Sequence, residues 1–296
     1  MRGTMSSVGT TRERNVVVET APSTVAGDAA RGTGTAGTRR RGWPLSSKTT
    51  HRLVGVGSVV GLLVLWQVMA DLNWVDPATS SSPSNVWDTA RQMISDGTLG
   101  SAVASSGKLY GVGFGIAIVI GVLGGIVLGW VRILGAIFDP WIAILYSTPL
   151  IAMLPLILVW FGITFKGQVV MVVLVSVFPL LVNVMAGTRQ VDPALLRLAK
   201  SFRASQLAIV RTLVLPSIVP YIVTGVRLAA GGGLIGVTVA EYFEGDNGIG
   251  GLILREGTEL NAGGVFVGIV VLAGAALTIT VIIRMLEGRV SGWRED

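Results

Sequence analysis

The sequence contains no cysteine and a single histidine, His51, among its 296 residues. The absence of cysteine excludes disulfides, cysteine–zinc sites and thiol catalysis. His51 lies beside Arg52 in a basic flank, and we interpret it as a solvated residue rather than a ligand or a base. The sequence also lacks a Walker A phosphate loop, a metal-spaced cluster of ligands and a Ser-His-Asp set. Most classes of enzyme are therefore excluded, and we predict no catalytic residue and no metal site.

Charged residues are scarce as well. They make up 14% of the chain, whereas soluble domains carry about 25%. Hydrophobic residues make up 51%, and they gather in runs of about 20 residues, the length that a bilayer requires. The sequence therefore predicts a polytopic membrane protein. Its net charge of +6 is expected to set the topology rather than to bind nucleic acid.

The N-terminal part differs in composition from the rest. Residues 1–45 are rich in Gly, Thr, Ala, Ser and Arg and show no apolar periodicity, which predicts a disordered cytoplasmic tail. We assign residues 46–296 to a membrane domain. Its first apolar run, from Leu53 to Ala70, follows a basic flank and lacks a convincing signal-cleavage site. We expect an uncleaved helix whose N-terminus faces the cytoplasm.

Five more apolar segments complete a predicted all-α fold with six transmembrane helices. They run from about Leu109 to Trp130, Pro140 to Gly162, Gln168 to Gly187, Ser217 to Glu241 and Gly263 to Met285. Basic residues gather before the first span, in residues 189–216 and in the C-terminal tail, whereas acids dominate loops 71–108 and 241–261. The positive-inside rule then places both termini in the cytoplasm.

Two details of the outer loops follow from this topology. A short helix is expected from Val86 to Ile94, with Ser84 or Asn85 as its N-cap. Glu241 ends the fifth span, and we interpret it as an ordinary carboxylate at the outer interface, with a gating role as the alternative.

Glycines recur every four residues in the second span, at Gly111 and Gly115 and again at Gly121, Gly125 and Gly129. Small residues at this spacing let a neighbouring backbone approach closely. We expect packing within one subunit, and dimerisation is the alternative. In the fifth span, the glycine triplet 231–233 predicts a local weakening of the helix.

Polar groups and prolines within the spans suggest candidates for a translocation pathway. Pro149 and Pro155 should kink the third span, and hydroxyls just before Pro149 could satisfy the freed carbonyls. Simple packing is an equal alternative for this kinked helix. The pathway candidates are Ser147, Thr148, Met153, Asn183 and Arg227.

Arg227 is the most informative of these candidates because a charge deep in a membrane is costly. Such a residue usually pairs with another charge or lines a wet cavity. If Arg227 faces the cavity, it favours an anionic solute. The alternative is that the helix begins later and Arg227 extends to the inner interface.

The stretch from Arg189 to Pro216 is a basic island between apolar spans. Asp192 can cap a helix that starts at Pro193. Its apolar residues recur at helical spacing and its basic residues lie on other faces, which predicts an amphipathic helix beneath the membrane. A helix on the lipid surface is the alternative. The apolar positions are Leu195, Leu198, Ala199 and Phe202.

This stretch resembles the cytoplasmic signature of ABC importer permeases, in which E-A-A is followed by three residues, Gly, nine residues, Ile, one residue and Leu-Pro. Aligned back from Leu215 and Pro216, Leu213 takes the Ile position and Arg203 the Gly position, while residues 197–199 take the E-A-A positions. The segments SSPSNVW, PLIAMLPLILVWFGI and VTVAEYFEGDNGIGGLI resemble the sulfonate, taurine and nitrate branch. The resemblance covers about residues 53–290.

The resemblance implies a type I importer (MetI-like) core in the plasma (inner) membrane. It also implies a homodimer surrounded by membrane lipid, ABC ATPase subunits (two of them) that bind ATP and Mg, and an extracytoplasmic solute-binding protein. The chain itself would hold no cofactor. Residues implied to couple to the ATPase are Arg197, Leu198, Ala199, Lys200, Ser201, Phe202, Arg203, Ala204, Ser205, Leu215 and Pro216.

Two positions depart from the signature, because Arg197 reverses the charge of the acid and Arg203 replaces the glycine. They imply either an ATPase groove with compensating acids or weaker coupling. A secondary transporter or channel without an ATPase is the alternative function, although the spans lack paired acids and repeated halves. A degenerate, non-transporting scaffold is the third, supported only by these two arginines.

Overall fold

The structure is a computed structural model that describes residues 48–72, 74, 80–244 and 247–291. The expected tail, residues 1–45, lies outside the described residues. By its contacts the chain divides into Met1–His51 and Arg52–Asp296. The second unit carries the helical domain, and within its described residues all regular structure is helical.

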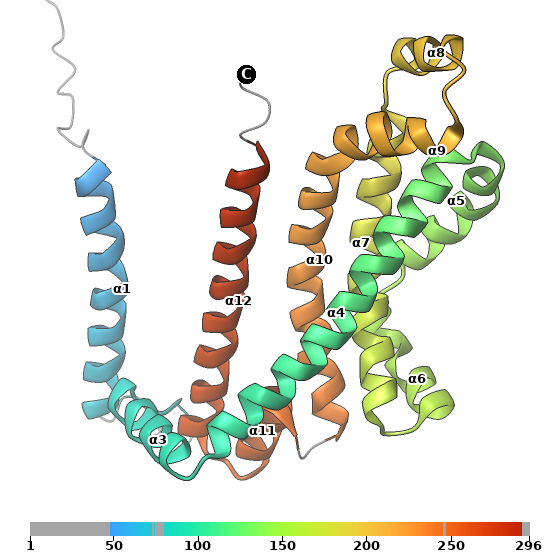
Figure 1. Cartoon of the computed structure of the whole chain (residues 1–296). Helices are drawn as coiled ribbons and strands as arrows, with labels where there is room; N and C mark the ends of the chain where they lie inside the picture. Colours follow the sequence, from blue (N-terminus) through green and yellow to red (C-terminus); the bar gives the residue numbers. More distant parts are fainter. Residues whose placement is uncertain (1–47, 73, 75–79, 245–246, 292–296) are drawn as a thin grey trace, which may run out of the picture. The chain divides into compact units, whose positions relative to one another are not determined.

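The helices follow one another as shown in Figure 1. They are α1 (Lys48–Asp71), α3 (Pro83–Ser95), α4 (Thr98–Trp130), α5 (Arg132–Ser147), the 3-10 turn η1 (Leu150–Met153), α6 (Leu154–Phe161), α7 (Phe165–Arg189), α8 (Pro193–Ser201), α9 (Gln206–Ile209), the π turn η2 (Val210–Val214), α10 (Leu215–Glu244), α11 (Gly248–Thr258) and α12 (Ala262–Ser291). Within the described residues, five helices are long and apolar enough to cross a membrane, or up to six if the bent pair α5 and η1–α6 is one span. The predicted all-α membrane fold is confirmed.

Helix α7 lies at the centre of the domain and packs against both α4 and α10. Small residues make this possible, because a Cβ added at Gly121 of α4 or Gly225 of α10 would lie within 3.0 Å of the Leu180 side chain on α7. The expected packing of the α4 glycines within one subunit is therefore confirmed for Gly121, Gly125 and Gly129. Gly111 and Gly115 are different, since an added Cβ at either meets no other described atom within 4 Å.

The glycine triplet of the fifth span does not weaken the helix, so that expectation was wrong. Helix α10 continues from Leu215 to Glu244. An added Cβ at Gly232 would lie 3.2 Å from the Val175 carbonyl oxygen, and one at Gly233 would lie 2.9 Å from the Ser176 hydroxyl. The close approach to α7 that the missing side chains allow stabilises the helix where propensity alone would not.

The third predicted span is broken rather than kinked. Its two halves, α5 and η1–α6, meet at 92°. The break falls at Thr148, whose ψ of 136° is the extended backbone expected before a proline. Pro155 causes no kink because it lies in the first turn of α6. The hydroxyls of Ser147 and Thr148 both donate to the Ile144 carbonyl, at 3.0 and 2.8 Å.

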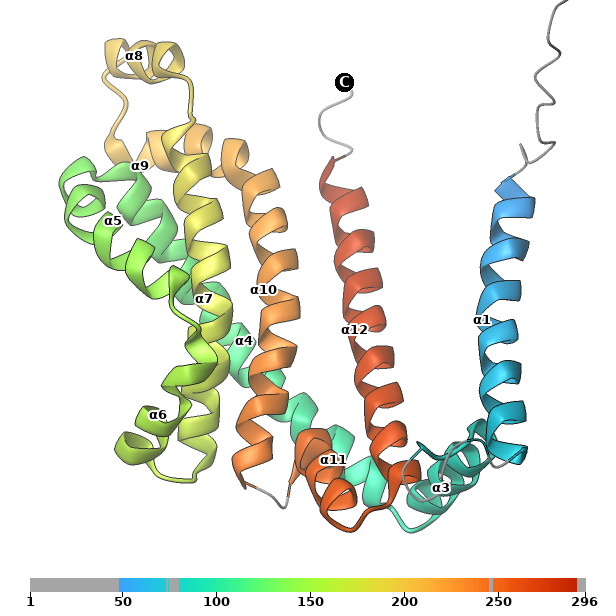
Figure 2. The ribbon, with the colours of Figure 1, turned by 180° about the vertical axis from the view of Figure 1, so that it is seen from behind.

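The two regions expected to be outer loops hold helices. Figures 1 and 2 show α3 and α11 at the end of the long helices opposite α8. Helix α3 begins at Pro83 and is capped by Ser82, whose Oγ accepts from the Asn85 N–H at 3.2 Å. The expected caps, Ser84 and Asn85, were wrong because proline suits the first helical position and places the cap before it. Helix α11 buries Ile249, Leu252 and Ile253 against Met93, Leu99, Ala102 and Val267.

Candidate functional site

The predicted amphipathic helix is present as α8. The Asp192 Oδ1 accepts a hydrogen bond from the Ala194 N–H at 2.7 Å, and Pro193 occupies the first helical position. These features are the predicted cap and start. Helix α8 lies beyond α9 at one end of the long helices (Figures 1 and 2).

The faces of α8 differ in part from the prediction. Leu196 and Ala199 pack toward the cluster around Val191 and Ile209, so Ala199, one of the four predicted apolar positions, is partly buried, and Leu196 was missed. Leu195, Leu198 and Phe202 are 44%, 55% and 78% exposed. We call these three residues, with exposed Leu207 and the exposed basic residues Arg197, Lys200 and Arg203, the coupling surface. Exposed apolar stripes of this kind are found at contacts with partner proteins and with membrane surfaces.

Arg203 adopts the conformation that the glycine of the signature would adopt. Its φ is 54°. The Arg203 N–H donates to the Lys200 carbonyl at 2.9 Å, and the Ala204 N–H donates to the Ala199 carbonyl at 3.2 Å. This pair of bonds is a Schellman motif, whose left-handed position normally holds glycine. The signature therefore has glycine at the position where the chain turns at the end of α8. Arginine keeps this turn here, although a left-handed backbone is less favourable for arginine than for glycine.

Two polar contacts connect Arg189 and Gln190, at the start of the stretch from Arg189 to Pro216, to α5 and α10. The Arg189 guanidinium donates to both oxygens of Asp139 on α5, at 2.9 and 3.0 Å. The Tyr221 hydroxyl on α10 donates to Gln190 Oε1 at 2.7 Å. At the other end of the loop, the exposed Leu215 and Pro216 form the first turn of α10, after the π turn η2. Sequence reasoning missed Asp139 and Tyr221 because neither belongs to a local pattern.

Glu241 is a buried residue at the opposite end of the domain, which corrects its interpretation as an outer-interface carboxylate. It is only 2% exposed. Its Oε1 accepts from the Ser106 hydroxyl at 2.7 Å, and its Oε2 accepts from the Gly250 N–H at 2.9 Å. The same Ser106 oxygen accepts from the Ile249 N–H at 2.8 Å. The carboxylate therefore caps the positive N-terminus of α11 and joins it to α4 and α10.

We expect Glu241→Gln to destabilise the protein by about 1–3 kcal/mol, because an amide cannot accept at both positions and leaves a buried donor unsatisfied. Thermal unfolding of the purified protein in detergent measures this effect. Glu259→Gln is the matched control, since Glu259 is exposed near the end of α11. Equal stability of the two variants would show that the cap contributes little.

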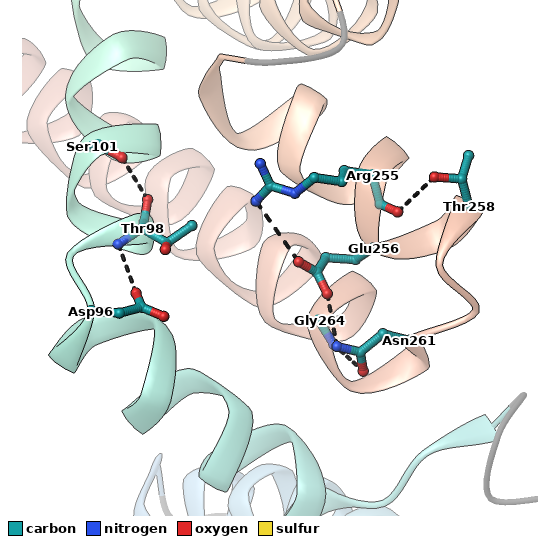
Figure 3. Close-up of polar contacts among 8 residues, drawn as sticks. All are labelled: Asp96, Thr98, Ser101, Arg255, Glu256, Thr258, Asn261 and Gly264. Carbon is teal, nitrogen blue, oxygen red and sulfur yellow. Dashed lines mark hydrogen bonds and ion pairs between the residues drawn. The ribbon is translucent and has the colours of Figure 1, made fainter.

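The turn between α11 and α12 is held by a second buried acid (Figure 3). Glu256 Oε2 accepts from Asn261 Nδ2 at 2.7 Å, and its Oε1 lies 3.8 Å from the Arg255 guanidinium.

Asp96 lies in the turn between α3 and α4 (Figure 3), where its carboxylate accepts from the Thr98 N–H at the start of α4. Hydrogen bonds from the Thr98 hydroxyl and N–H hold the pKa of Asp96 below its usual 3.8.

The pathway candidates lie on three parts of the structure. Ser147, Thr148 and Met153 lie at the bend between α5 and α6. Asn183 is on α7, where its Nδ2 donates to the Pro179 carbonyl at 2.7 Å. Arg227 is on α10 and forms an ion pair with Glu287 of α12. Glu287 was missed because it lies past Met285, the predicted end of the sixth span. The role of all five candidates in a pathway stays a prediction.

Two adjoining cavities lie near the capped end of α11, and we call them together the outer cleft. The larger has a volume of about 250 Å³ and is lined by residues that include Ser105, Lys108, Phe165, Gln168, Glu241 and Asn247. The smaller, about 50 Å³, is lined by residues that include Thr98, Ser101, Ser105, Asn247 and Arg255. None of the five pathway candidates lines either cavity.

The fold and these sites define a polytopic membrane protein with a basic amphipathic helix at one end. In the part of the chain that the structure describes, no group of three His, Asp or Glu side chains could hold a metal ion. Residues 117–292 match the family of binding-protein-dependent transport system inner membrane components. The chain belongs to this family and is the permease subunit of a binding-protein-dependent ABC importer, a multi-pass inner-membrane protein that is not itself the enzyme.

Three relatives of this chain are permeases of the sulfonate, taurine and nitrate branch that its sequence resembles. The taurine transport system permease protein TauC of Escherichia coli (strain K12) is 28% identical over 259 residues, covering 86% of this chain and 93% of the relative. A putative aliphatic sulfonates transport permease protein, SsuC of the same organism, is 29% identical over 77% of this chain and 87% of its own. The nitrate import permease protein NrtB of Synechococcus elongatus is 27% identical over 76% and 83%.

Proposed function

We propose that this permease carries a small solute with an oxyanion group, such as an anionic sulfonate, nitrate or the zwitterion taurine, and couples to a separate ATPase through the coupling surface. The names of the relatives support the class of solute. The coupling role rests on one observation, the exposed apolar stripe of α8 with basic side chains beside it. Such a stripe, on a loop with a capped and terminated helix, is suited to a groove on a partner.

The proposed cycle uses a homodimer of this chain, two ATPase subunits and a solute-binding protein. ATP closes the ATPase pair, which moves α8. The Arg189–Asp139 and Gln190–Tyr221 contacts pass this motion to α5 and α10, and the cavity opens outward to accept solute from the binding protein. Hydrolysis then resets the cavity. In this proposal both termini, including the tail 1–45, are cytoplasmic.

Arg227 has a smaller part in this proposal than its depth suggested. Its ion pair with Glu287 neutralises its charge, and Glu287 lies in the last turns of α12. The pair supports the interpretation in which Arg227 extends toward the inner interface, so the charge that selects an anion is sought elsewhere.

Co-expression with the cognate ATPase and binding protein tests the function. We expect the ATPase to co-purify with this chain, and we expect proteoliposomes to take up taurine, ethanesulfonate or nitrate only with ATP and binding protein. Uptake that continues without ATP would instead establish a secondary transporter or channel. ATP hydrolysis that does not respond to solute and binding protein would establish a non-transporting scaffold.

A further inference from the structure

The outer cleft contains a cation that forms no ion pair with another described residue. Lys108 projects from α4, and its ammonium lies 5.2 Å from the centre of the Phe165 ring. The ion pairs of the described residues are Arg189–Asp139, Arg227–Glu287 and Arg255–Glu256, and Lys108 belongs to none of them. Lys108 is exposed and lines a cavity of about 250 Å³ together with the carboxylate of Glu241, and its ammonium is the group there that can attract an anionic ligand.

Hydroxyl groups continue this surface along α4. Thr98, Ser101, Ser105 and Lys108 recur at the three- and four-residue spacing that places side chains on one helix face. The Ser101 hydroxyl donates to the Thr98 carbonyl at 2.9 Å. Ser105 lines both cavities, and within the described residues its hydroxyl has no protein partner. Ser105 is thus a free donor one helical turn from Lys108.

A second cation lies at the other end of this face. The Arg255 guanidinium lines the smaller cavity. Its neighbour Glu256 is 3.8 Å away and is also bound to Asn261 (Figure 3), so the pairing with Arg255 is loose. The row of hydroxyls is therefore flanked by two basic groups.

The carboxylate of Glu241 also lines the larger cavity, and its hydrogen bonds decide what it contributes. Its oxygens accept from Ser106 and from the Gly250 N–H. The N–H groups of Ile249 and Gly250 in the first turn of α11 are consequently satisfied by protein atoms and are not a site for an anion. Lys108, Ser105 and Arg255 remain as the donors that a ligand in the cleft would meet.

We propose that the outer cleft is a transit site for the oxyanion group of the solute, with Lys108 as its main counter-charge and Ser105 as its hydrogen-bond donor. A sulfonate, nitrate or carboxylate has the charge and the acceptor oxygens for these groups. The proposal rests on the proposed function for the direction of transport, in which solute arrives at the end of the domain opposite α8.

The cysteine-free sequence allows a direct test on the full-length chain in membranes. Ser105→Cys introduces one thiol into the cleft. Its thiolate attacks a methanethiosulfonate reagent, which forms a mixed disulfide and releases methanesulfinate. We compare the rates with the anionic sulfonatoethyl reagent and the cationic trimethylammonioethyl reagent. The ratio of the rates cancels differences in thiolate fraction and reports the local potential.

Relative to the rates of the two reagents with a free thiol in solution, we expect the anionic reagent to be favoured, and we expect Lys108→Gln in the Ser105→Cys background to lower the ratio about tenfold. Excess ethanesulfonate should slow labelling by the anionic reagent and not by the cationic one. Lys166→Gln is the matched control, because Lys166 is an exposed lysine next to Phe165 that does not line the cleft. If Ser105→Cys does not fold, Ser101→Cys carries the same measurement.

A ratio that does not change in Lys108→Gln, or that falls equally in Lys166→Gln, would overturn the transit site. Absence of protection by ethanesulfonate in Ser101→Cys, which places the thiol in the smaller cavity and keeps Ser105, would do the same. The labelling needs neither the ATPase nor uptake. Failure of ATPase capture with a normal labelling ratio therefore refutes the proposed function alone, whereas normal uptake with an unchanged ratio refutes the transit site alone.

Discussion

Replacing both Gly125 and Gly129 with alanine is expected to separate α4 from α7 and to prevent stable folding. A Cβ at Gly125 would lie 2.7 Å from Val184 Cβ and 2.9 Å from the Leu181 carbonyl oxygen. One at Gly129 would lie 2.6 Å from Thr188 Cβ and 2.9 Å from the Met185 carbonyl oxygen. Because each added Cβ also meets a backbone carbonyl oxygen of α7, a change of side-chain rotamer cannot relieve the contact at either site. Each added methyl should cost about 1–3 kcal/mol, a large part of a stability of about 5–15 kcal/mol.

The other glycine pair of α4 provides the matched control. Gly111→Ala with Gly115→Ala makes the same chemical change on the same helix, but no described atom lies within 4 Å of either added Cβ. We expect this variant to fold and to melt at or above the wild-type temperature, because alanine favours a helix by about 1 kcal/mol over glycine. Equal melting of the two double variants would show that α4 does not pack on α7 as described.

The same control addresses the alternative role of these glycines. If Gly111 and Gly115 form a contact between two copies of the chain, their replacement should lower the fraction of cross-linked dimer without lowering the melting temperature. Loss of dimer in this variant would support that alternative. An unchanged dimer fraction would assign the contact to another face.

Features set by local sequence were predictable. The long apolar runs gave the positions of the spans because a bilayer fixes the length of a helix that crosses it. Asp192 and Pro193 gave the start of α8 because capping depends on neighbouring residues. The position of Arg203 in the signature followed from the alignment, although its φ of 54° did not.

Features set by contacts between distant segments were not predictable. Glu241 meets Ser106 from 135 positions away in the chain, and nothing in the surrounding sequence distinguishes a capping carboxylate from an interfacial one. The outer cleft was missed for the same reason, since its lining comes from α4, α7, α10 and α11. To predict the break at Thr148, one would need to know whether Pro149 or Pro155 ends a helix, and packing between distant segments decides that.

Reversing the charge at Arg197 is expected to abolish stable assembly with the native ATPase. Arg197 is exposed on α8 within the coupling surface, and it occupies a position where the family signature has an acid. If the partner groove carries compensating acids, Arg197→Glu places like charges together, which costs several kcal/mol. Capture of the ATPase on immobilised permease should then fall at least a hundredfold, about 2.7 kcal/mol. Arg91→Glu, an exposed arginine on α3 at the opposite end, is the control and should leave capture unchanged.

Arg203 requires two substitutions because it combines a charge with a left-handed backbone. Arg203→Gly removes both the charge and the strain, whereas Arg203→Asn removes the charge and keeps a residue that tolerates a positive φ. Each should weaken capture through the lost charge, and Arg203→Gly should also stabilise the end of α8 by about 1 kcal/mol. Hydrogen exchange at Arg203 and Ala204 measures the second effect. If capture and uptake were unaffected or improved in Arg197→Glu and Arg203→Gly, the groove would not be acidic, and the two arginines would mark weakened coupling instead.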